Sequence, residues 1–200
     1  MTTEARIVRR TGWIVEIGGG TFAGAEAAAS RALARGARAL ISFGLAGGLD
    51  PTLRAGDVVV PAAVSVRGRT IATDTGLCAP TAASLLGAET VVSDTSQKQA
   101  VFAATGCVAV DIESGAVAAV ASAAGVPFAA VRAICDTADR TLPPAALVAL
   151  DNAGAIGFVR LLTSIVAHPT QIPALIGLGR DAARARTALL DWLSKNVREP

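Results

Sequence analysis

Predominantly apolar runs of strand length are the feature that most constrains how this chain can fold. They span residues 38–43, 107–110 and 128–134. Helical patterns lie between them: Thr21 offers an N-cap to an alanine-rich helix that ends near Gly36, and residues 114–124 form a second helix that ends at Gly125. Strands that are apolar along their whole length belong to sheets with helices on both faces. The sequence therefore predicts a three-layer α/β/α fold around a central mixed, largely parallel sheet, in a single domain that spans residues 1–200.

Shorter elements complete the predicted fold. Residues 13–17 have the pattern of a short strand, and residues 44–48 that of a glycine-rich loop. Residues 57–66 are predicted to form a strand that turns at Gly68 into a second strand ending at Ala72. Helices are predicted over residues 97–104, from Pro143 onward with breaks near Gly154, Pro169 and Pro173, and over residues 181–197.

Composition narrows the functional classes. The 200 residues carry a net charge of +2 and no basic stripe with interleaved aromatic residues, so no nucleic-acid partner is predicted. The three cysteines, Cys78, Cys107 and Cys135, lack Cys-x-x-Cys spacing, which argues against a disulfide framework or a zinc site. The single histidine, His168, leaves no convincing Ser-His or Cys-His triad, so no metal and no triad chemistry are predicted.

No membrane segment is predicted from the hydropathy pattern. The first six residues lack the apolar stretch of a secretory signal. A bilayer span needs roughly 20 mostly apolar residues. The longest apolar region, residues 155–178, is interrupted too often to provide them. The interruptions are Arg160, His168, Pro169, Gln171 and Pro173. The chain is therefore expected to be cytoplasmic and to lack stable membrane insertion.

Chemically special segments follow the predicted strands. They are residues 18–20 and 44–48, which are rich in glycine, residues 111–113, which contain two acids, and the pair Cys135-Asp136. In open α/β sheets, ligands bind beyond the carboxyl ends of the strands. The four segments are therefore expected to meet at one edge of the sheet and to form the functional site.

The first glycine cluster has two interpretations. Gly18, Gly20 and Ala23 match the dinucleotide-binding pattern G-x-G-x-x-G/A between a strand and a helix. That pattern also needs an acidic residue at the end of the next strand, where this sequence has Ser42. A tight turn, or a helix N-terminus that receives an anion or a ribose hydroxyl, is therefore favoured over dinucleotide binding. Residues 44–48 indicate either close approach of the backbone to a ligand or a tight crossover.

Asp111 and Glu113 flank Ile112 where a buried strand gives way to a helix. Acidic residues at such a place are often simple helix caps. On an extended segment, however, alternation sends Asp111 and Glu113 to the same side, where one of them could accept hydrogen bonds from paired sugar hydroxyls. Both interpretations stay open at this point.

Asp136 follows the buried run that contains Arg132. A carboxylate at the end of a buried strand is costly unless it is paired or used, and burial raises its pKa, which suits a general acid. The alternatives are an ion pair with Arg132 or a cap formed with Thr137. Asp139 is a second candidate acid in a less apolar setting.

Three segments resemble a known superfamily. Residues 42–49 with residues 53–61 resemble the strand-loop-strand signature of the nucleoside phosphorylase and methylthioadenosine nucleosidase superfamily. Residues 110–116, Val-Asp-Ile-Glu-Ser-Gly-Ala, resemble its Val-Glu-Met-Glu-x-x-Ala segment. Residues 131–139 resemble its Arg-x-Ile-Ser-Asp-x-Ala-Asp segment. The three occur in the order of the superfamily and span most of residues 12–140.

A narrower likeness is to the hopanoid-associated phosphorylases of bacteria. Residues 42–50 and residues 142–147 carry it. The resemblance implies an enzyme that releases adenine from adenosylhopane, with phosphate as the nucleophile and with no cofactor. It also implies a homodimer, because sites of this superfamily are commonly completed by a neighbouring subunit.

The resemblance implies roles for individual residues. Glu113 would bind the ribose 2′ and 3′ hydroxyls, with Ile112 packed on the sugar. Asp136 would protonate or hydrogen-bond the purine, and Glu4 matches a glutamate that activates water in the nucleosidases. The residues expected to bind substrate are Ala46, Gly47, Asp111, Ile112, Arg132 and Cys135, the last in the place of the usual serine.

The sequence departs from the superfamily pattern in three places. Only Met-Thr-Thr precedes Glu4, so the usual first strand is expected to be missing or trimmed. Phosphorylases place an arginine and a serine around the glycine segment to bind phosphate, where this chain has Ser42 and Leu45. Residues 93–97, which align with purine-stacking contacts, are shortened. Loss of two phosphate ligands makes hydrolysis an alternative to phosphorolysis.

Two further functions stay open at this stage. The first is a 5′-methylthioadenosine or S-adenosylhomocysteine nucleosidase, which would release a free ribose derivative instead of a ribose 1-phosphate. The second is an inactive nucleoside- or lipid-binding protein, which would bind adenosine without turnover.

Overall fold

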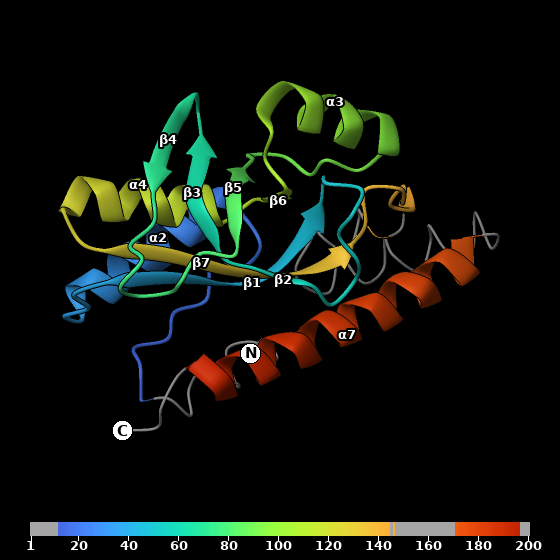
Figure 1. Cartoon of the computed structure of the whole chain (residues 1–200). Coiled ribbons are helices and arrows are strands. Elements are labelled where there is room, and N and C mark those ends of the chain that lie inside the picture. The colour runs from blue at the N-terminus through green and yellow to red at the C-terminus, as the bar shows by residue number, and fades with distance from the viewer. Residues whose placement is uncertain (1–11, 145, 147–170, 197–200) are drawn as a thin grey trace.

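A seven-stranded mixed sheet forms the centre of the part of the chain that the computed structural model describes, residues 12–144, 146 and 171–196 (Figure 1). Its strand order is β2-β7-β1-β6-β5-β3-β4. The strands are β1 (Leu40–Gly48), β2 (Val58–Val59), β3 (Pro61–Val66), β4 (Arg69–Ala72), β5 (Ala82–Gly87), β6 (Ala109–Asp111) and β7 (Phe128–Asp136). The pairs β1–β7, β3–β5 and β5–β6 are parallel, whereas β1–β6, β2–β7 and β3–β4 are antiparallel.

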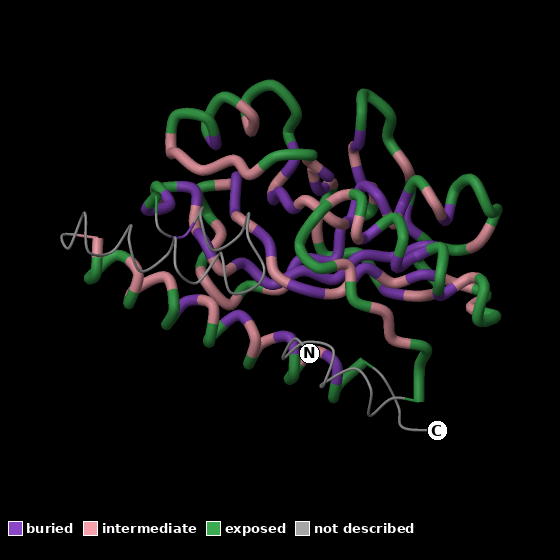
Figure 2. Tube along the Cα trace, turned by 180° about the vertical axis from the view of Figure 1, so that it is seen from behind, coloured by how far each residue is buried: buried purple, intermediate pink, exposed green. Residues whose placement is uncertain are grey.

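Helices cover both faces of this sheet, which confirms the predicted three-layer fold. On one face, α4 (Ser114–Ala124) contacts the strands and α2 (Phe22–Ala34) packs on α4. On the other face, α7 (Ile172–Asn196) contacts β7, β1 and β2. A further helix, α3 (Thr95–Thr105), lies near the end of β6 (Figure 1). Figure 2 shows the buried residues concentrated in the central strands and on the inner sides of the helices.

Strand β7 divides the core between the two faces. Phe128, Ala130 and Ile134 belong to the apolar cluster shared with α2 and α4. The alternate residues on β7 pack in the cluster shared with α7. Because side chains alternate along a strand, Arg132 points toward the α4 side, and this position decides the architecture of the site.

Helices α2 and α4 begin and end as their sequence signals predict. Thr21 accepts a hydrogen bond from the backbone N–H of Gly24, at 3.0 Å, and so caps α2. Gly125 follows α4 with a φ of 66°, a left-handed conformation that glycine adopts without a Cβ penalty. Both ends depend on contacts within four residues, so the local sequence is enough to place them.

The prediction of a loop at residues 44–48 is wrong, because β1 continues through Gly48. At Gly44 the missing side chain leaves room for another side chain instead of permitting a turn. A Cβ built on Gly44 would lie 2.5 Å from Nη1 of Arg132. Gly47 pairs with β6 on one side and with β7 on the other.

The strand predicted over residues 57–66 is interrupted between β2 and β3. At Val60 the backbone N–H donates to Oγ1 of Thr81 at 3.0 Å instead of joining a ladder. The predicted turn is confirmed: Arg67 has a φ of 49° and Gly68 a φ of 71°, and they connect β3 to β4. Strand β5 had no predicted counterpart, because its Ala-Ala-Ser-Leu-Leu-Gly sequence carries little strand preference.

The strand predicted over residues 13–17 is also wrong. No strand is assigned among residues 12–21, and among the described residues the sheet ends at β2 on one side and at β4 on the other. The segment is instead held by side chains. Glu16 accepts hydrogen bonds from Arg31 at 2.8 Å and from Arg35 at 2.7 Å, both at the C-terminal end of α2. Val15 packs near Leu193 of α7.

Glu16→Gln tests this attachment. Hydrogen bonds from Arg31 and Arg35 lower the pKa of Glu16 from its ordinary 4.5. A carboxyl group whose pKa is lower in the folded protein than in the unfolded chain stabilises the fold at pH values above its unfolded-state pKa. The stabilisation from Glu16 is therefore present above about pH 4.5 and is lost as the pH falls through the lowered pKa of the folded state. Because both arginines are exposed, we expect a loss of roughly 0.2–1 kcal/mol at pH 7. Urea unfolding at pH 7 and at about pH 3 should show a larger difference at the higher pH; an equal difference at both values would contradict this.

Helix α7 begins at Ile172, earlier than the predicted 181, and continues through Pro173, whose missing N–H is not needed in a first turn. The predicted breaks at Gly154 and Pro169, and His168 itself, lie outside the described residues. Among the helices of the described part, none has the length and apolar character needed to cross a membrane.

Candidate active site

Three strand segments converge around Gly47 of β1. In the β1–β6 pair, Gly47 lies opposite Val110, one residue before Asp111. In the β1–β7 pair, an irregularity after Ala46 places Gly47 opposite Asp136. The ends of β6 and β7 therefore flank the same short stretch of β1. Because β6 runs antiparallel to β1, the acidic segments do not meet at one carboxyl edge of the sheet as expected; they reach β1 from its two sides at Gly47.

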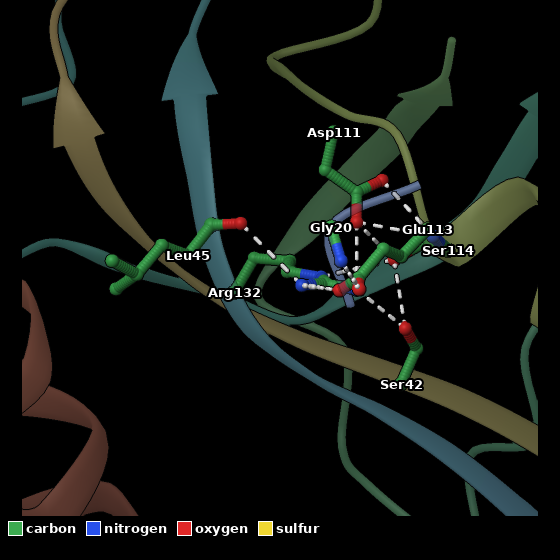
Figure 3. Close-up of polar contacts among 7 residues, drawn as sticks. All are labelled: Gly20, Ser42, Leu45, Asp111, Glu113, Ser114 and Arg132. Atoms are coloured by element: carbon green, nitrogen blue, oxygen red, sulfur yellow. Dashed lines mark hydrogen bonds and ion pairs between the residues drawn. The ribbon is translucent and has the colours of Figure 1, made fainter. Parts of the chain in front are cut away.

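Arg132 is the centre of a buried polar cluster on the α4 side of β7 (Figure 3). Only 2% of its side chain is exposed, and its Nη2 lies 2.6 Å from Oδ2 of Asp111. Its Nε donates to Oγ of Ser114 at 3.0 Å, and its Nη2 donates to Oγ of Ser42 at 2.5 Å. Its Nη1 donates to the carbonyl of Leu45 at 3.4 Å. Each guanidinium nitrogen thus has a protein partner, which buried cations require.

Asp111 forms an ion pair with Arg132 and also caps the start of α4. Its Oδ2 accepts a hydrogen bond from the hydroxyl of Ser114 at 2.9 Å, and its two oxygens accept from the backbone N–H of Ser114 at 3.0 and 3.2 Å. Burial raises the pKa of Asp111, and the nearby Arg132 opposes that rise. Asp111 therefore caps α4, and its carboxylate oxygens already have partners within the protein. Its predicted contact with substrate stays a prediction.

Glu113 is the acid of this cluster that reaches solvent, with 24% of its side chain exposed. Its Oε1 accepts from the backbone N–H of Gly20 at 2.9 Å, and its Oε2 lies 3.6 Å from Nη1 of Arg132. A Cβ on Gly18 would lie 2.6 Å from Oε1, so the glycine permits this approach. Glu113 makes no cap bond to α4, unlike Asp111. Its carboxylate is therefore positioned by the protein and still accessible to a ligand.

Asp136 has a different partner from either predicted alternative. Its Oδ2 lies 2.5 Å from Nζ of Lys98 on α3, and neither Arg132 nor a Thr137 cap holds it. Its Oδ1 is buried and has no hydrogen-bond partner in the described structure. Burial raises the pKa of Asp136, and the hydrogen bond from Lys98 opposes that rise. The site thus contains a buried carboxyl group with one oxygen held and one oxygen unused.

Sequence reasoning did not identify Lys98. A signal was present: Lys98, Val101 and Phe102 have the i, i+3, i+4 spacing of one helix face, and the latter two pack on an apolar cluster. A lysine on the apolar face of a helix indicates a buried cation with a partner elsewhere. That partner is 38 residues away in sequence, so local patterns do not reveal it.

Two neighbours of Asp136 are less suited to proton transfer. The Cys135 thiol is near the carbonyl of Ala46, with Sγ at 3.6 Å, and burial together with Asp136 raises its pKa to about 11. The thiol is therefore neutral at ordinary pH. Asp139 is exposed and accepts a hydrogen bond from Thr137 that lowers its pKa. Of the two candidate acids, Asp136 has the environment that favours the protonated form.

The structure also places most of the other residues predicted to form the site. Ala46 is buried on β1, and Ile112 is half-buried between the two acids. Ser42 and Leu45 are the two residues that the sequence resemblance aligns with phosphate ligands. Ser42 is buried and accepts from Arg132, and Leu45 contributes its carbonyl to the same arginine. Glu4 lies outside the described residues.

Solved structures share this fold at low sequence identity. S-adenosylhomocysteine nucleosidase from Streptococcus pyogenes, in complex with 5-methylthiotubericidin, is 19% identical with a TM-score of 0.59, covering 88% of this chain and 75% of that one. The 5′-methylthioadenosine/S-adenosylhomocysteine nucleosidase of Helicobacter pylori, with butyl-thio-DADMe-Immucillin-A, is 17% identical with a TM-score of 0.58, covering 88% and 76%. A futalosine hydrolase mutant of Helicobacter pylori is 19% identical with a TM-score of 0.51, covering 57% and 66%.

Membership of a family follows from the sequence comparison. No curated protein matches the chain. A family model described as the phosphorylase superfamily matches residues 7–84 and 72–167, which together make up more than half of the chain. This chain therefore belongs to the phosphorylase superfamily.

Proposed function

We propose that this protein cleaves the N-glycosidic bond of a purine nucleoside, with Asp136 acting on the leaving base and Glu113 binding the sugar. The observation that carries the proposal is the carboxyl group of Asp136. It is buried beside Gly47, Lys98 holds its Oδ2, and its Oδ1 has no partner among the described residues. A buried polar atom without a partner is costly, so a ligand that completes it is one explanation for its presence. Membership of the phosphorylase superfamily supports the reaction class.

Glu113 supplies the second half of the proposed site. It is partly exposed, and it is oriented by Gly20 on one side and Arg132 on the other. A carboxylate held in this way can accept two hydrogen bonds from neighbouring hydroxyls of a ribose. Every guanidinium nitrogen of Arg132 already has a partner within the protein, so Arg132 would not bind the substrate itself. Its proposed role is to fix the position of Glu113.

The proposed mechanism is dissociative. The bond between the sugar C1′ and the purine nitrogen breaks, and its electron pair leaves with the base. Asp136 donates a proton to the departing ring, and Glu113 holds the sugar hydroxyls while positive charge develops on the sugar. A nucleophile then bonds to C1′ from the opposite face with its own electron pair; when it is water, its surplus proton passes to solvent, and solvent returns a proton to Asp136. Proton transfer by a positioned side chain contributes roughly 10²–10⁴-fold to such a rate.

The nucleophile is phosphate or water. Two features support water. Ser42 is buried against Arg132, and Leu45 places an apolar side chain where similar phosphorylases have a phosphate ligand. The similar solved structures include two nucleosidases and a futalosine hydrolase, which is consistent with hydrolysis. Resemblance to the hopanoid-associated phosphorylases supports phosphate and an adenosylhopane-type substrate.

The 5′ substituent of the substrate distinguishes the candidate functions. We propose an adenosylhopane-type nucleoside on the basis of the sequence resemblance in residues 42–50 and 142–147. The second candidate is a 5′-methylthioadenosine or S-adenosylhomocysteine nucleosidase, which the similar solved structures favour. A bulky lipid group and a small thioether differ enough in size that one assay series can separate them.

Chromatography of the products tests the proposal. The purified protein is incubated with adenosine, 5′-methylthioadenosine, S-adenosylhomocysteine and a 5′-alkyl adenosine, with and without phosphate. We expect adenine release from at least one of them. Release that requires phosphate and yields a ribose 1-phosphate identifies a phosphorylase, and release without phosphate identifies a nucleosidase. Saturable binding of all four without adenine release would contradict the proposal and favour an inactive binding protein.

A further inference from the structure

Lys98 is buried in a complete set of acceptors. None of its surface is exposed, and it is the only buried residue of α3. Its Nζ donates to Oδ2 of Asp136 at 2.5 Å, to the carbonyl of Thr137 at 2.8 Å and to the carbonyl of Arg140 at 2.7 Å. A lysine ammonium has three donors and no acceptor, so these three bonds satisfy it fully. The ammonium of Lys98 is therefore held in a fixed orientation by these three acceptors.

Packing alone does not require a charge at this position. Helix α3 also contacts the core through Val101 and Phe102, and it is capped by Asp94, which accepts from the N–H of Gln97 at 2.8 Å. Burying a lysine is expensive, and a well-packed apolar residue often stabilises a protein as well as a buried ion pair does. The cation at Lys98 therefore calls for an explanation beyond attachment of the helix.

We propose that Lys98 is a positioning residue that holds Oδ2 of Asp136 and so presents Oδ1 to the leaving purine base. The inference rests on the proposed function, because it explains how the Asp136 carboxyl group is oriented for that reaction. Both halves of the geometry are defined: Oδ2 has a partner at 2.5 Å, and Oδ1 is buried with none in the described structure. A carboxyl group without Lys98 would be free to turn and to offer either oxygen.

Lys98 also affects the charge state of Asp136. Burial raises the pKa of Asp136, the Lys98 hydrogen bond and charge lower it, Arg140 lowers it, and Asp139 raises it. The Cys135 thiol next to it stays neutral, because its own pKa is about 11. Arg140 is directed to Asp181 of α7, 2.6 Å away, so Lys98 is the cation in direct contact. Removing Lys98 should therefore raise the pKa of Asp136 further and make its proton harder to release.

The test is a double-mutant cycle on adenine release from 5′-methylthioadenosine, or from whichever of the four nucleosides wild type cleaves. The variants are Lys98→Met, Lys98→Arg, Asp136→Asn and the double variant Lys98→Met with Asp136→Asn. Lys195→Met, at an exposed position on α7, is the matched control. Steady-state kcat and KM are measured from pH 5 to pH 9, and circular dichroism establishes folding of each variant.

We expect Lys98→Met to lower kcat at least tenfold with KM within about threefold, and to shift upward the pH limb that Asp136→Asn abolishes. Lys98→Arg should recover part of kcat because it restores a cation. In the Asp136→Asn background, Lys98→Met should change kcat by less than about threefold, since its partner is already gone. This comparison holds even when Lys98→Met alone does not fold, because the double variant leaves neither charge unpaired.

The outcomes separate this inference from the proposed function. A further tenfold loss in the double variant, or an unshifted pH limb in folded Lys98→Met, would overturn the role of Lys98 while leaving nucleoside cleavage intact. Full activity of Asp136→Asn, or no adenine release by wild type from any of the four nucleosides, would instead remove the proposed function. The inference about Lys98 would then be wrong with it.

Discussion

Arg132→Met is expected to lower the free energy of unfolding by about 3–5 kcal/mol, which is the range for breaking a buried ion pair from one side. The substitution leaves Asp111 buried without its cation, and it removes the donors to Ser114 and Ser42. Urea denaturation followed by circular dichroism measures the change. Arg69→Met, on the exposed strand β4, is the matched control and should stay within about 0.5 kcal/mol of wild type.

A second variant shows whether the loss comes from the uncompensated carboxylate. Combining Arg132→Met with Asp111→Asn removes both charges, so we expect it to recover part of the stability lost in the single variant. Loss of less than about 1 kcal/mol in Arg132→Met would contradict the view that this arginine organises the cluster, since a buried unpaired carboxylate should cost more than that.

Asp136→Asn is expected to lower kcat for purine release by roughly 10²–10⁴-fold, because asparagine preserves the shape of the side chain but cannot donate a proton as a carboxylic acid does. The measurement is steady-state adenine formation on the best substrate of the four nucleosides. Asp191→Asn, at an exposed position on α7, is the matched control and should retain activity within about twofold of wild type.

The second candidate acid gives this experiment a direct comparison. Asp139→Asn should affect kcat far less than Asp136→Asn, because Asp139 is exposed and its pKa is lowered by the hydrogen bond from Thr137. A larger loss in Asp139→Asn than in Asp136→Asn would transfer the proposed acid role to Asp139. Near-full activity in both variants would exclude a carboxylic acid at this strand end as the proton donor.

Local sequence signals predict much of this fold. Thr21 and Gly125 are a cap and a terminator whose bonds stay within about one helical turn, so α2 and α4 could be placed from sequence. Strand β7 could be predicted because it is apolar almost throughout and lies between helices on both faces. The sequence placed Asp111 and Asp136 at strand ends, but it did not predict that β6 runs antiparallel to β1 and so brings the ends of β6 and β7 to the two sides of Gly47.

Long-range contacts explain what the sequence did not predict. The glycines of β1 suggested a loop, because nothing nearby in sequence shows that Gly44 must admit the guanidinium of Arg132. Residues 13–17 have strand-forming side chains, yet a strand needs a neighbour, and Glu16 instead attaches them to α2. Lys98 and Asp136 are far apart in sequence, so their contact becomes apparent only in the folded chain.

The central claim is that Glu113, which contacts Gly20 and Arg132, and Asp136, which lies beside Gly47, act together to cleave a purine nucleoside. The most direct measurement is single-turnover adenine release by wild type, Glu113→Gln and Asp136→Asn at saturating enzyme, with folding of each protein established by circular dichroism. The account predicts that wild type converts all bound nucleoside to adenine and that each variant slows the release about a hundredfold or more while remaining folded. Equal rates in all three proteins, or no release by wild type from any of the four nucleosides, would contradict it.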